Sequence, residues 1–236
     1  MSDVGSTMTM VEHLEELRRR LIVVLAAGGI AAVLGFVVSG SVIDLLRTPL
    51  PEKYATLYFT GPAGAFGAQL KIAGFLGIAL AMPVVLFEAW RFITPGLTSR
   101  ERRLVWPLLL AATLLFVLGV AVGFAIIPYA LTFLLGFARE GVQPLLTIDD
   151  YIGFVTTLLL VFGLVMEFPI VLVALARIGM LSHARLAQQR RWAILGIVLF
   201  AIVATPGGDP ISPTILSGLM YLLFEGTLLV IRLMRR

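Results

Sequence analysis

Six apolar stretches, separated by polar segments that carry the charges, run along the chain. They cover about residues 21–38, 67–93, 104–127, 152–178, 192–204 and 211–231. About 20 apolar residues are enough for an α-helix to cross the hydrocarbon core of a bilayer, and backbone within lipid must be hydrogen-bonded internally. The pattern therefore predicts an all-α membrane protein of six transmembrane helices. The connections are too short for a separate soluble domain, so we expect a single domain over residues 1–236.

The composition excludes an ordinary soluble protein. Of the 236 residues 59% are hydrophobic and 14% are charged, and the mean hydropathy is +1.01, whereas soluble domains average about 45–50% apolar and about 25% charged. The absence of cysteine excludes disulfides, thiolate metal sites and cysteine nucleophiles. The two histidines lie far apart in sequence, and neither lysine belongs to a phosphate-binding loop. We therefore expect no metal, no cofactor and no nucleotide hydrolysis by such a loop.

Basic residues alternate between the two sides of the predicted bundle. Four lie on one side: Arg47, Lys53, Lys71 and Arg139. The other fourteen lie at the two ends of the chain and in the second and fourth connections: Arg18, Arg19, Arg20, Arg91, Arg100, Arg102, Arg103, Arg177, Arg185, Arg190, Arg191, Arg232, Arg235 and Arg236. Because basic loops stay in the cytoplasm, both termini should be cytoplasmic. The net charge of +4 then lies where anionic lipid headgroups are. Lipid therefore explains the positive charge, and binding of nucleic acid is not needed to account for it.

The fifth apolar stretch is unusually short. Residues 192–204 would span about 20 Å of a core that is about 30 Å thick. The proline- and glycine-rich segment 205–210 follows directly and predicts a tight turn. We expect the fifth and sixth spans to form a hairpin beside locally thinned lipid.

Acidic residues cluster in the N-terminal arm, which should be helical from Thr9 because Thr9 and Glu12 fit a capping box. Leu14, Leu17 and Leu21 recur at helical spacing and should face the bundle. Two interpretations of the acidic residues remain open. Glu15 and Glu16 could form i,i+4 ion pairs with Arg19 and Arg20, worth about 0.2–0.5 kcal/mol each, or they could form an acidic binding patch.

Three further acidic residues have both a structural and a functional interpretation. Glu101, in the second connection, fits a capping box with Thr98 or could bind a ligand. Glu167 lies mid-span beside Pro169; it could be a protonated, hydrogen-bonded packing residue or a polar contact point for a peptide or partner helix. Asp209 could cap the sixth span or contact a partner. Glu88 and Glu225 lie nearer the inner ends, where water or arginine should reach them.

An ordered set of motifs resembles the TatC family of the twin-arginine protein translocase. The segment 13–21 resembles the family's N-terminal signature, and Phe92–Leu97 followed by Glu101–Arg103 resembles its first cytoplasmic loop. Further landmarks follow in family order: Thr48–Leu50, Glu167–Pro169, Thr205–Asp209 and Phe224–Glu225. The resemblance covers about residues 13–230 and implies six spans in a curved, concave bundle in the inner membrane of a prokaryote.

The resemblance also implies a function and the residues that carry it. The chain would receive folded proteins that bear twin-arginine signal peptides and would assemble with TatA- and TatB-type single-span partners and with itself. The proton gradient would drive the export. Glu16 and Glu101 would bind the signal arginines, and further residues would shape that site: Glu15, Arg18, Phe92 and Arg103. Pro49 would fix the outer loop. Intramembrane or partner contacts would come from Glu167, Asp209, Ser212 and Thr214. Pro213 departs from the family, which often has glutamine there.

Two other functions are open to a six-span chain. An ion-coupled transporter of small molecules could use Glu167 as its coupling site. An intramembrane protease would need a nucleophile and a base within the spans, but no histidine lies there, so we set that class aside. We expect a receptor and scaffold and not an enzyme.

Overall fold

The computed structural model describes residues 10–93, 105–177, 181 and 183–234. Within these residues the backbone is almost entirely helical, with two isolated β-bridges and no strand. The helices are α1 (Met10–Val37), α2 (Ser39–Arg47), the 3-10 helix η1 (Glu52–Tyr54), α3 (Gly64–Ile93), α5 (Val105–Leu135), α6 (Ile148–Val165), α7 (Phe168–Arg177), α8 (His183–Gln188), α9 (Arg190–Ala204), the 3-10 helix η3 (Pro206–Gly208) and α10 (Ile211–Met234). The predicted all-α fold class is confirmed.

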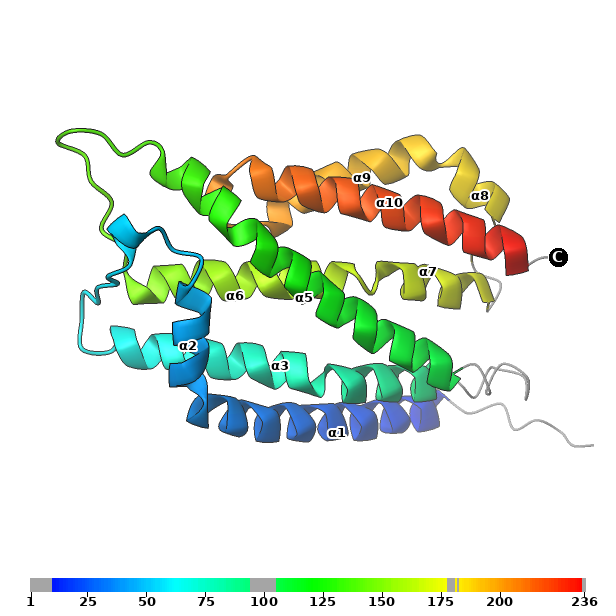
Figure 1. The fold of residues 1–236 in the computed structure, drawn as a ribbon. Helices are drawn as coiled ribbons and strands as arrows, with labels where there is room; N and C mark the ends of the chain where they lie inside the picture. The colour runs from blue at the N-terminus through cyan, green and yellow to red at the C-terminus, as the bar shows by residue number, and fades with distance from the viewer. Residues whose placement is uncertain (1–9, 94–104, 178–180, 182, 235–236) are drawn as a thin grey trace, which may run out of the picture.

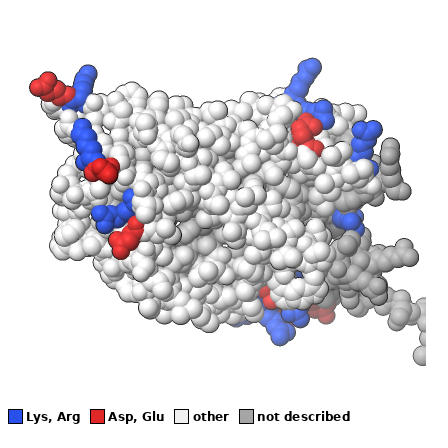
Figure 2. Space-filling model, viewed as in Figure 1, with Lys and Arg blue, Asp and Glu red and all other residues white. Residues whose placement is uncertain are grey.

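On the face shown in Figure 2, charged side chains gather toward the two ends of the molecule, and the surface between them is uncharged. Among the described residues, five segments are long and apolar enough to cross a membrane: Val11–Val37, Gly64–Phe92, Trp106–Leu135, Ile148–Arg177 and Ile211–Leu233. The remaining predicted span, the short fifth one, corresponds to α9, whose 15 residues give about 22 Å of helix at about 1.5 Å per residue. The apolar band and the helix lengths are those of a multi-pass membrane protein.

Helix α6 lies in the middle of the bundle, with α3 and α5 packed against it. Helices α1, α3 and α6–α7 lie side by side, α5 crosses them obliquely, and α9 and α10 form a hairpin along the opposite edge (Figure 1). The α6 side chains Ile152, Val155, Leu158 and Phe162 are fully buried. In contrast, only 6% of the apolar window of α1 is buried inside the protein, against 50% for Ile148–Arg177. Helix α6 is thus the core of the bundle, while α1 faces mainly lipid.

The outward exposure of α1 contradicts one expectation. Leu14, Leu17 and Leu21 were expected to face the bundle, yet they are 61%, 45% and 53% exposed. The reason is that α1 packs chiefly on a single neighbour, α3. On a helix at the edge of a membrane bundle, an apolar face can be turned to lipid as readily as to protein.

The fourth predicted span is two helices and not one. Helix α6 ends at Val165 and α7 begins at Phe168, so a break falls at Met166 and Glu167. Pro169 explains the break, because proline has no N–H and its ring clashes with the carbonyl four residues before it, here that of Val165. The N–H of Glu167 instead bonds the carbonyl of Leu164 at 3.1 Å. The chain therefore bends in mid-membrane at a carboxyl group.

A small cap covers the end of the bundle opposite the C-terminus (Figure 1). It consists of α2, η1 and the segment up to α3, and the amphipathic stretch Val42–Leu46, expected to be a short interfacial helix, lies within α2. Tyr58 holds the cap to the start of α6: its N–H bonds the carbonyl of Leu146 at 3.0 Å, and its carbonyl accepts the N–H of Ile148 at 2.7 Å. Pro49 lies two residues after the end of α2 and is half-buried.

Candidate functional site

An arginine bridges two carboxylates where the start of α1 meets the end of α3. Arg20 Nη1 donates to Glu88 Oε2 at 2.9 Å, and Arg20 Nη2 donates to Glu16 Oε1. Glu16 and Arg20 are one helical turn apart on α1, so they share a face. Because α1 and α3 run antiparallel and pack along their length, Glu88 near the end of α3 lies opposite them. The side chains of Glu16, Arg20 and Glu88 are 20%, 14% and 10% exposed.

The cluster leaves polar atoms without a partner. Within the described residues, Glu16 Oε2 and Arg20 Nε are buried and have no hydrogen-bond partner. A cavity of about 230 Å³ opens beside them, and its lining is polar or charged except for one valine: Glu16, Arg19, Arg20, Val23, Glu88 and Arg91. A buried polar group without a partner costs free energy, so the site has unused capacity to bind a donor at Glu16.

The structure shows which of the ion pairs predicted for the acidic N-terminal arm are formed. The Glu16–Arg20 ion pair is present, whereas Glu15 forms no ion pair with Arg19 in the described part of the chain. Glu15 and Arg18 are both exposed on α1. The expectation that arginine reaches Glu88 and Glu225 is confirmed by Arg20 and by the 2.9 Å pair from Arg190 Nη2 to Glu225 Oε2.

Aromatic rings lie next to this cluster. Phe92 stacks on His13, with ring centroids 4.4 Å apart and planes at 23°. The Arg91 guanidinium lies over the Phe87 ring, 5.9 Å from its centroid. The predicted site residues Glu101 and Arg103 lie outside the described residues. Of the predicted binding residues, Glu16 and Phe92 are thus near one another at one end of the α1–α3 pair, and sequence reasoning did not assign Arg20 or Glu88 to the site.

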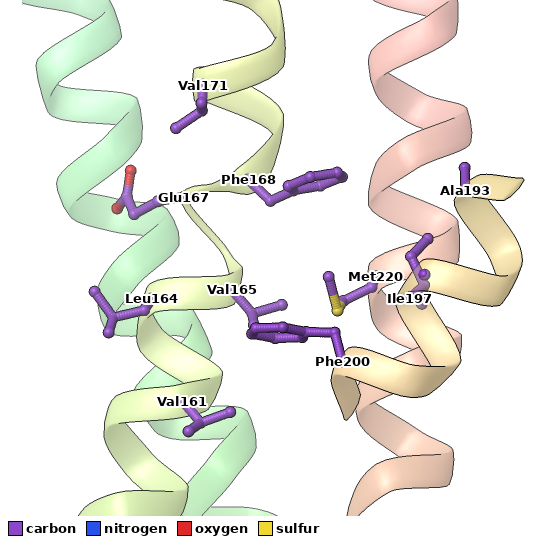
Figure 3. Close-up of a pocket in the computed structure, with 11 residues that line it drawn as sticks. Val161, Leu164, Val165, Glu167, Phe168, Val171, Ala193, Ile197, Phe200 and Met220 are labelled. Atoms are coloured by element: carbon purple, nitrogen blue, oxygen red, sulfur yellow. The ribbon is translucent and has the colours of Figure 1, made fainter. Parts of the chain in front are cut away.

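The second group of predicted residues begins with Glu167, at the break between α6 and α7. This residue is 7% exposed, and neither carboxyl oxygen has a partner among the described residues. It lines an apolar hollow of about 570 Å³ together with residues of α6, α7, α9 and α10. In Figure 3 the carboxyl group points away from the ring of Phe168, while Phe168, Phe200 and Met220 gather between the helices. The hydrogen bond expected for a protonated Glu167 side chain is thus absent from the described part of the structure.

Asp209 is the cap of α10, as one of its two interpretations predicted. Its Oδ1 accepts the N–H of Ser212 at 2.7 Å, which satisfies one of the free donors at a helix start. Asp209 is 3% exposed and Ser212 is 0% exposed, so neither is open to a partner helix in this conformation. Thr214 is exposed, and its hydroxyl donates to the carbonyl of Pro210 at 2.6 Å.

The comparison with known families is decisive. The model of the family described as Sec-independent protein translocase protein (TatC) matches residues 12–218. The chain belongs to the TatC family. The match contains most of α1, the Arg20 cluster, the Glu167 break and the start of α10, so every landmark that suggested the resemblance falls within it except Phe224–Glu225.

Relatives and solved structures agree with this membership. The TatC protein of Carboxydothermus hydrogenoformans is 33% identical over 229 residues, covering 97% of this chain and 94% of the relative. A chloroplastic TATC of Arabidopsis thaliana is 34% identical over 231 residues, covering 97% of this chain and 68% of the relative. A crystal structure of the twin arginine translocase receptor TatC matches with a TM-score of 0.82 and 35% identity, covering 95% of this chain and 100% of that chain.

Membership fixes the general function. This TatC-family chain is a subunit of the Sec-independent protein translocase, a multi-pass membrane protein of a transport family that is not enzymatic. A translocase subunit works with other components of its complex, and the six-span bundle is the family fold. The small-molecule transporter, which the sequence left open, has no comparable support.

Proposed function

We propose that this chain is the receptor subunit of the translocase and binds twin-arginine signal peptides beside Glu16. The observation that carries the proposal is the unpartnered, buried Oε2 of Glu16 next to a polar cavity of about 230 Å³. A guanidinium presents a rigid fork of N–H donors that matches the two oxygens of a carboxylate. A lysine ammonium is a point charge and cannot reproduce this geometry.

The surroundings of Glu16 fit a cationic peptide that also carries apolar residues. Exposed Glu15 adds negative charge on the same arm, and the stacked Phe92 and His13 rings offer an apolar and aromatic surface. Exposed Arg18 would position the peptide by contacting its backbone or an acidic group. Glu101 would bind the second signal arginine, with Arg103 beside it, as the family resemblance implies.

The same proposal assigns the membrane-embedded residues to partner binding. TatA- and TatB-type helices would dock along the apolar hollow that Glu167 helps to line, and its carboxyl group, which points away from the Phe168 ring in Figure 3, would turn toward the bound helix. A polar side chain within an otherwise apolar helix would find its hydrogen-bond partner there. Thr214 is exposed in the first turn of α10, at the end of the bundle proposed to face outward. Asp209 and Pro49 would shape that outer end. Ser212, being buried, would take part only if the start of α10 moved.

The receptor face would be cytoplasmic, with both termini in the cytoplasm and the cap of α2 outside. The support is the split of fourteen against four basic residues between the two sides that the sequence predicts. We assign the chain to the inner membrane of a prokaryote, where it would associate with further copies of itself in the active complex.

The test is the affinity of the purified full chain for a twin-arginine signal peptide and for its twin-lysine copy. We expect tighter binding of the arginine peptide, and Glu16→Gln should weaken that binding by about tenfold or more, since a charged hydrogen bond is worth roughly 1.5–3 kcal/mol. Glu101→Gln should act in the same direction. Glu225→Gln is the matched control, because Glu225 is also an arginine-paired carboxylate but lies on α10. Equal affinity for the two peptides would refute the receptor function.

A further inference from the structure

We propose that Arg20 is an internal occupant of the signal-arginine site: a peptide guanidinium takes Glu16 from Arg20, and Arg20 stays on Glu88. The inference rests on the proposed receptor function and adds a mechanism of selection to it. The juxtaposition that carries it is one guanidinium held between two carboxylates from different helices, at the wall of a cavity.

The hydrogen bonds of Arg20 are incomplete. It uses one nitrogen for each carboxylate, Nη1 for Glu88 and Nη2 for Glu16, and makes a two-nitrogen fork with neither. The remaining Oε2 of Glu16 and the Nε of Arg20 are buried without partners. An incoming guanidinium could pair with both oxygens of Glu16, which the shared Arg20 does not do. After the exchange both carboxyl oxygens of Glu16 are hydrogen-bonded, whereas only one is when Arg20 is its partner.

The charges of the cluster favour the same exchange. Two carboxylates share one guanidinium, so the trio is one positive charge short. Arg19 and Arg91 also line the cavity, but neither forms an ion pair with Glu16 or Glu88 in the described structure. The Arg91 guanidinium lies over the Phe87 ring instead. A peptide arginine would complete two separate pairs, peptide with Glu16 and Arg20 with Glu88, without leaving Arg20 unpaired.

An internal occupant explains how the site can reject lysine. A ligand must compensate for the loss of the Arg20–Glu16 pair before it gains net affinity. A peptide arginine can do so with its fork, but a lysine offers a single nitrogen and a strongly hydrated charge. Arg20 thus lowers the affinity for both peptides. Because the lysine peptide makes the weaker contact with Glu16, its affinity is the first to fall below a useful level. Discrimination of this kind depends on the cost imposed on the wrong ligand as well as on contacts to the right one.

The experiment measures binding of the twin-arginine peptide and its twin-lysine copy to the full chain and to five variants. Arg20→Gln removes the competitor, so the arginine peptide should bind about 3- to 10-fold tighter, the gain expected if Arg20 occupies Glu16 for roughly 70–90% of the time. The twin-lysine peptide should gain at least as much. Arg20→Lys should give a smaller gain and serves if Arg20→Gln is unstable. Arg190→Gln is the control, because Arg190 is ion-paired to Glu225, and it should leave both affinities unchanged.

Glu88→Gln separates the exchange from a direct contact. Without Glu88, Arg20 has only Glu16 as a partner and should hold it more tightly, so the arginine peptide should bind about 3- to 10-fold more weakly. Adding Arg20→Gln to this variant should recover the affinity for the arginine peptide. If Glu88 touched the peptide itself, or if Arg20 only braced α1 against α3, the double variant would stay weak, because coupling within a pair is what such a cycle isolates.

Failure of this inference is distinct from failure of the receptor function. Weaker binding to Arg20→Gln and Arg20→Lys, in chains that retain the wild-type unfolding temperature, would overturn the exchange while the arginine preference of the wild type still supported a receptor. A wild-type chain with no arginine preference would remove both. If the Glu88→Gln, Arg20→Gln double variant still bound the arginine peptide weakly, the exchange would be overturned and the receptor function would not.

Discussion

The hydroxyl of Tyr151, in the first turn of α6, donates a 2.6 Å hydrogen bond to the backbone carbonyl of Leu46 near the end of α2. Both side chains are buried, at 3% exposure each. Since α2 lies across the end of the bundle (Figure 1), this bond ties the cap to the central helix. It also satisfies a phenol group that would otherwise be buried alone among apolar side chains.

Replacing Tyr151 by phenylalanine should therefore loosen the cap without creating a cavity. The Leu46 carbonyl would lose its tyrosine donor, and we expect the free energy of unfolding to fall by about 1–2 kcal/mol. Thermal unfolding of the purified protein measures this, and protease sensitivity of the segment between α2 and α3 should rise with it. Tyr129→Phe is the control because Tyr129 is 64% exposed. Equal unfolding temperatures for the two variants would contradict the role of the bond.

Close contact between α5 and α6 depends on Gly119. A Cβ atom at this position would lie 2.7 Å from Met166 Cγ and 2.9 Å from the Cα of Gly163, and it would also strike the carbonyl of Phe162. Small residues allow membrane helices to approach in this way. Gly119→Ala should cost about 1–3 kcal/mol because backbone, unlike a flexible side chain, cannot move aside. Gly29→Ala in α1, with nothing within 4 Å, should leave the unfolding temperature unchanged or raise it.

The sequence predicted the membrane class, the helical spans and the short fifth span because these depend on hydropathy and length alone. It also predicted the capping role of Asp209, which is decided by neighbouring residues. The bend at Glu167 follows from Pro169, and the clash with the Val165 carbonyl was foreseeable, but whether the helix would bend or break is decided by packing.

Two features lay beyond the sequence because they depend on which helices meet. Leu14 has the spacing of a core residue yet faces outward, since the apolar pattern of a membrane helix does not distinguish lipid from protein. The sharing of Arg20 between Glu16 and Glu88 joins residues 68 positions apart. Its local half, the i,i+4 pair, was predictable. Its other half requires the antiparallel contact of α1 and α3, which no local pattern gives.

The proposed orientation predicts which positions are accessible from each side. The chain has no cysteine, so a single introduced thiol reports one position. Thr56→Cys, in the exposed segment before α3, should react with an impermeant maleimide applied to intact cells, and Ala184→Cys, exposed in α8, should react only after the membrane is opened. The reverse order of labelling would overturn the assignment of both termini to the cytoplasm.

Asp209 should stabilise the protein through the hydrogen bond that its Oδ1 accepts from the Ser212 N–H. Asp209→Ala removes the acceptor for the Ser212 N–H and should lower the free energy of unfolding by about 1 kcal/mol, the usual cost of losing a cap. Asp209→Asn keeps an oxygen acceptor and should lose less. If Asn and Ala were equally destabilising, the hydrogen bond would not be the reason. Partner assembly that fails in both variants while both remain folded would instead favour a contact role for this residue.

Glu167 should show opposite effects on stability and on transport. The residue is 7% exposed and both its carboxyl oxygens are unpartnered in the described structure, and a buried polar group without a hydrogen bond costs about 1–3 kcal/mol. Glu167→Leu removes that group, so the unfolding temperature should stay level or rise. Export of a twin-arginine cargo should nevertheless fall, because a partner helix would lose its polar contact in the hollow between α7 and α9. Leu164→Ala, also at the lining but apolar, is the control for altered packing. Full export by a stable Glu167→Leu chain would show that the carboxyl group is not a partner contact.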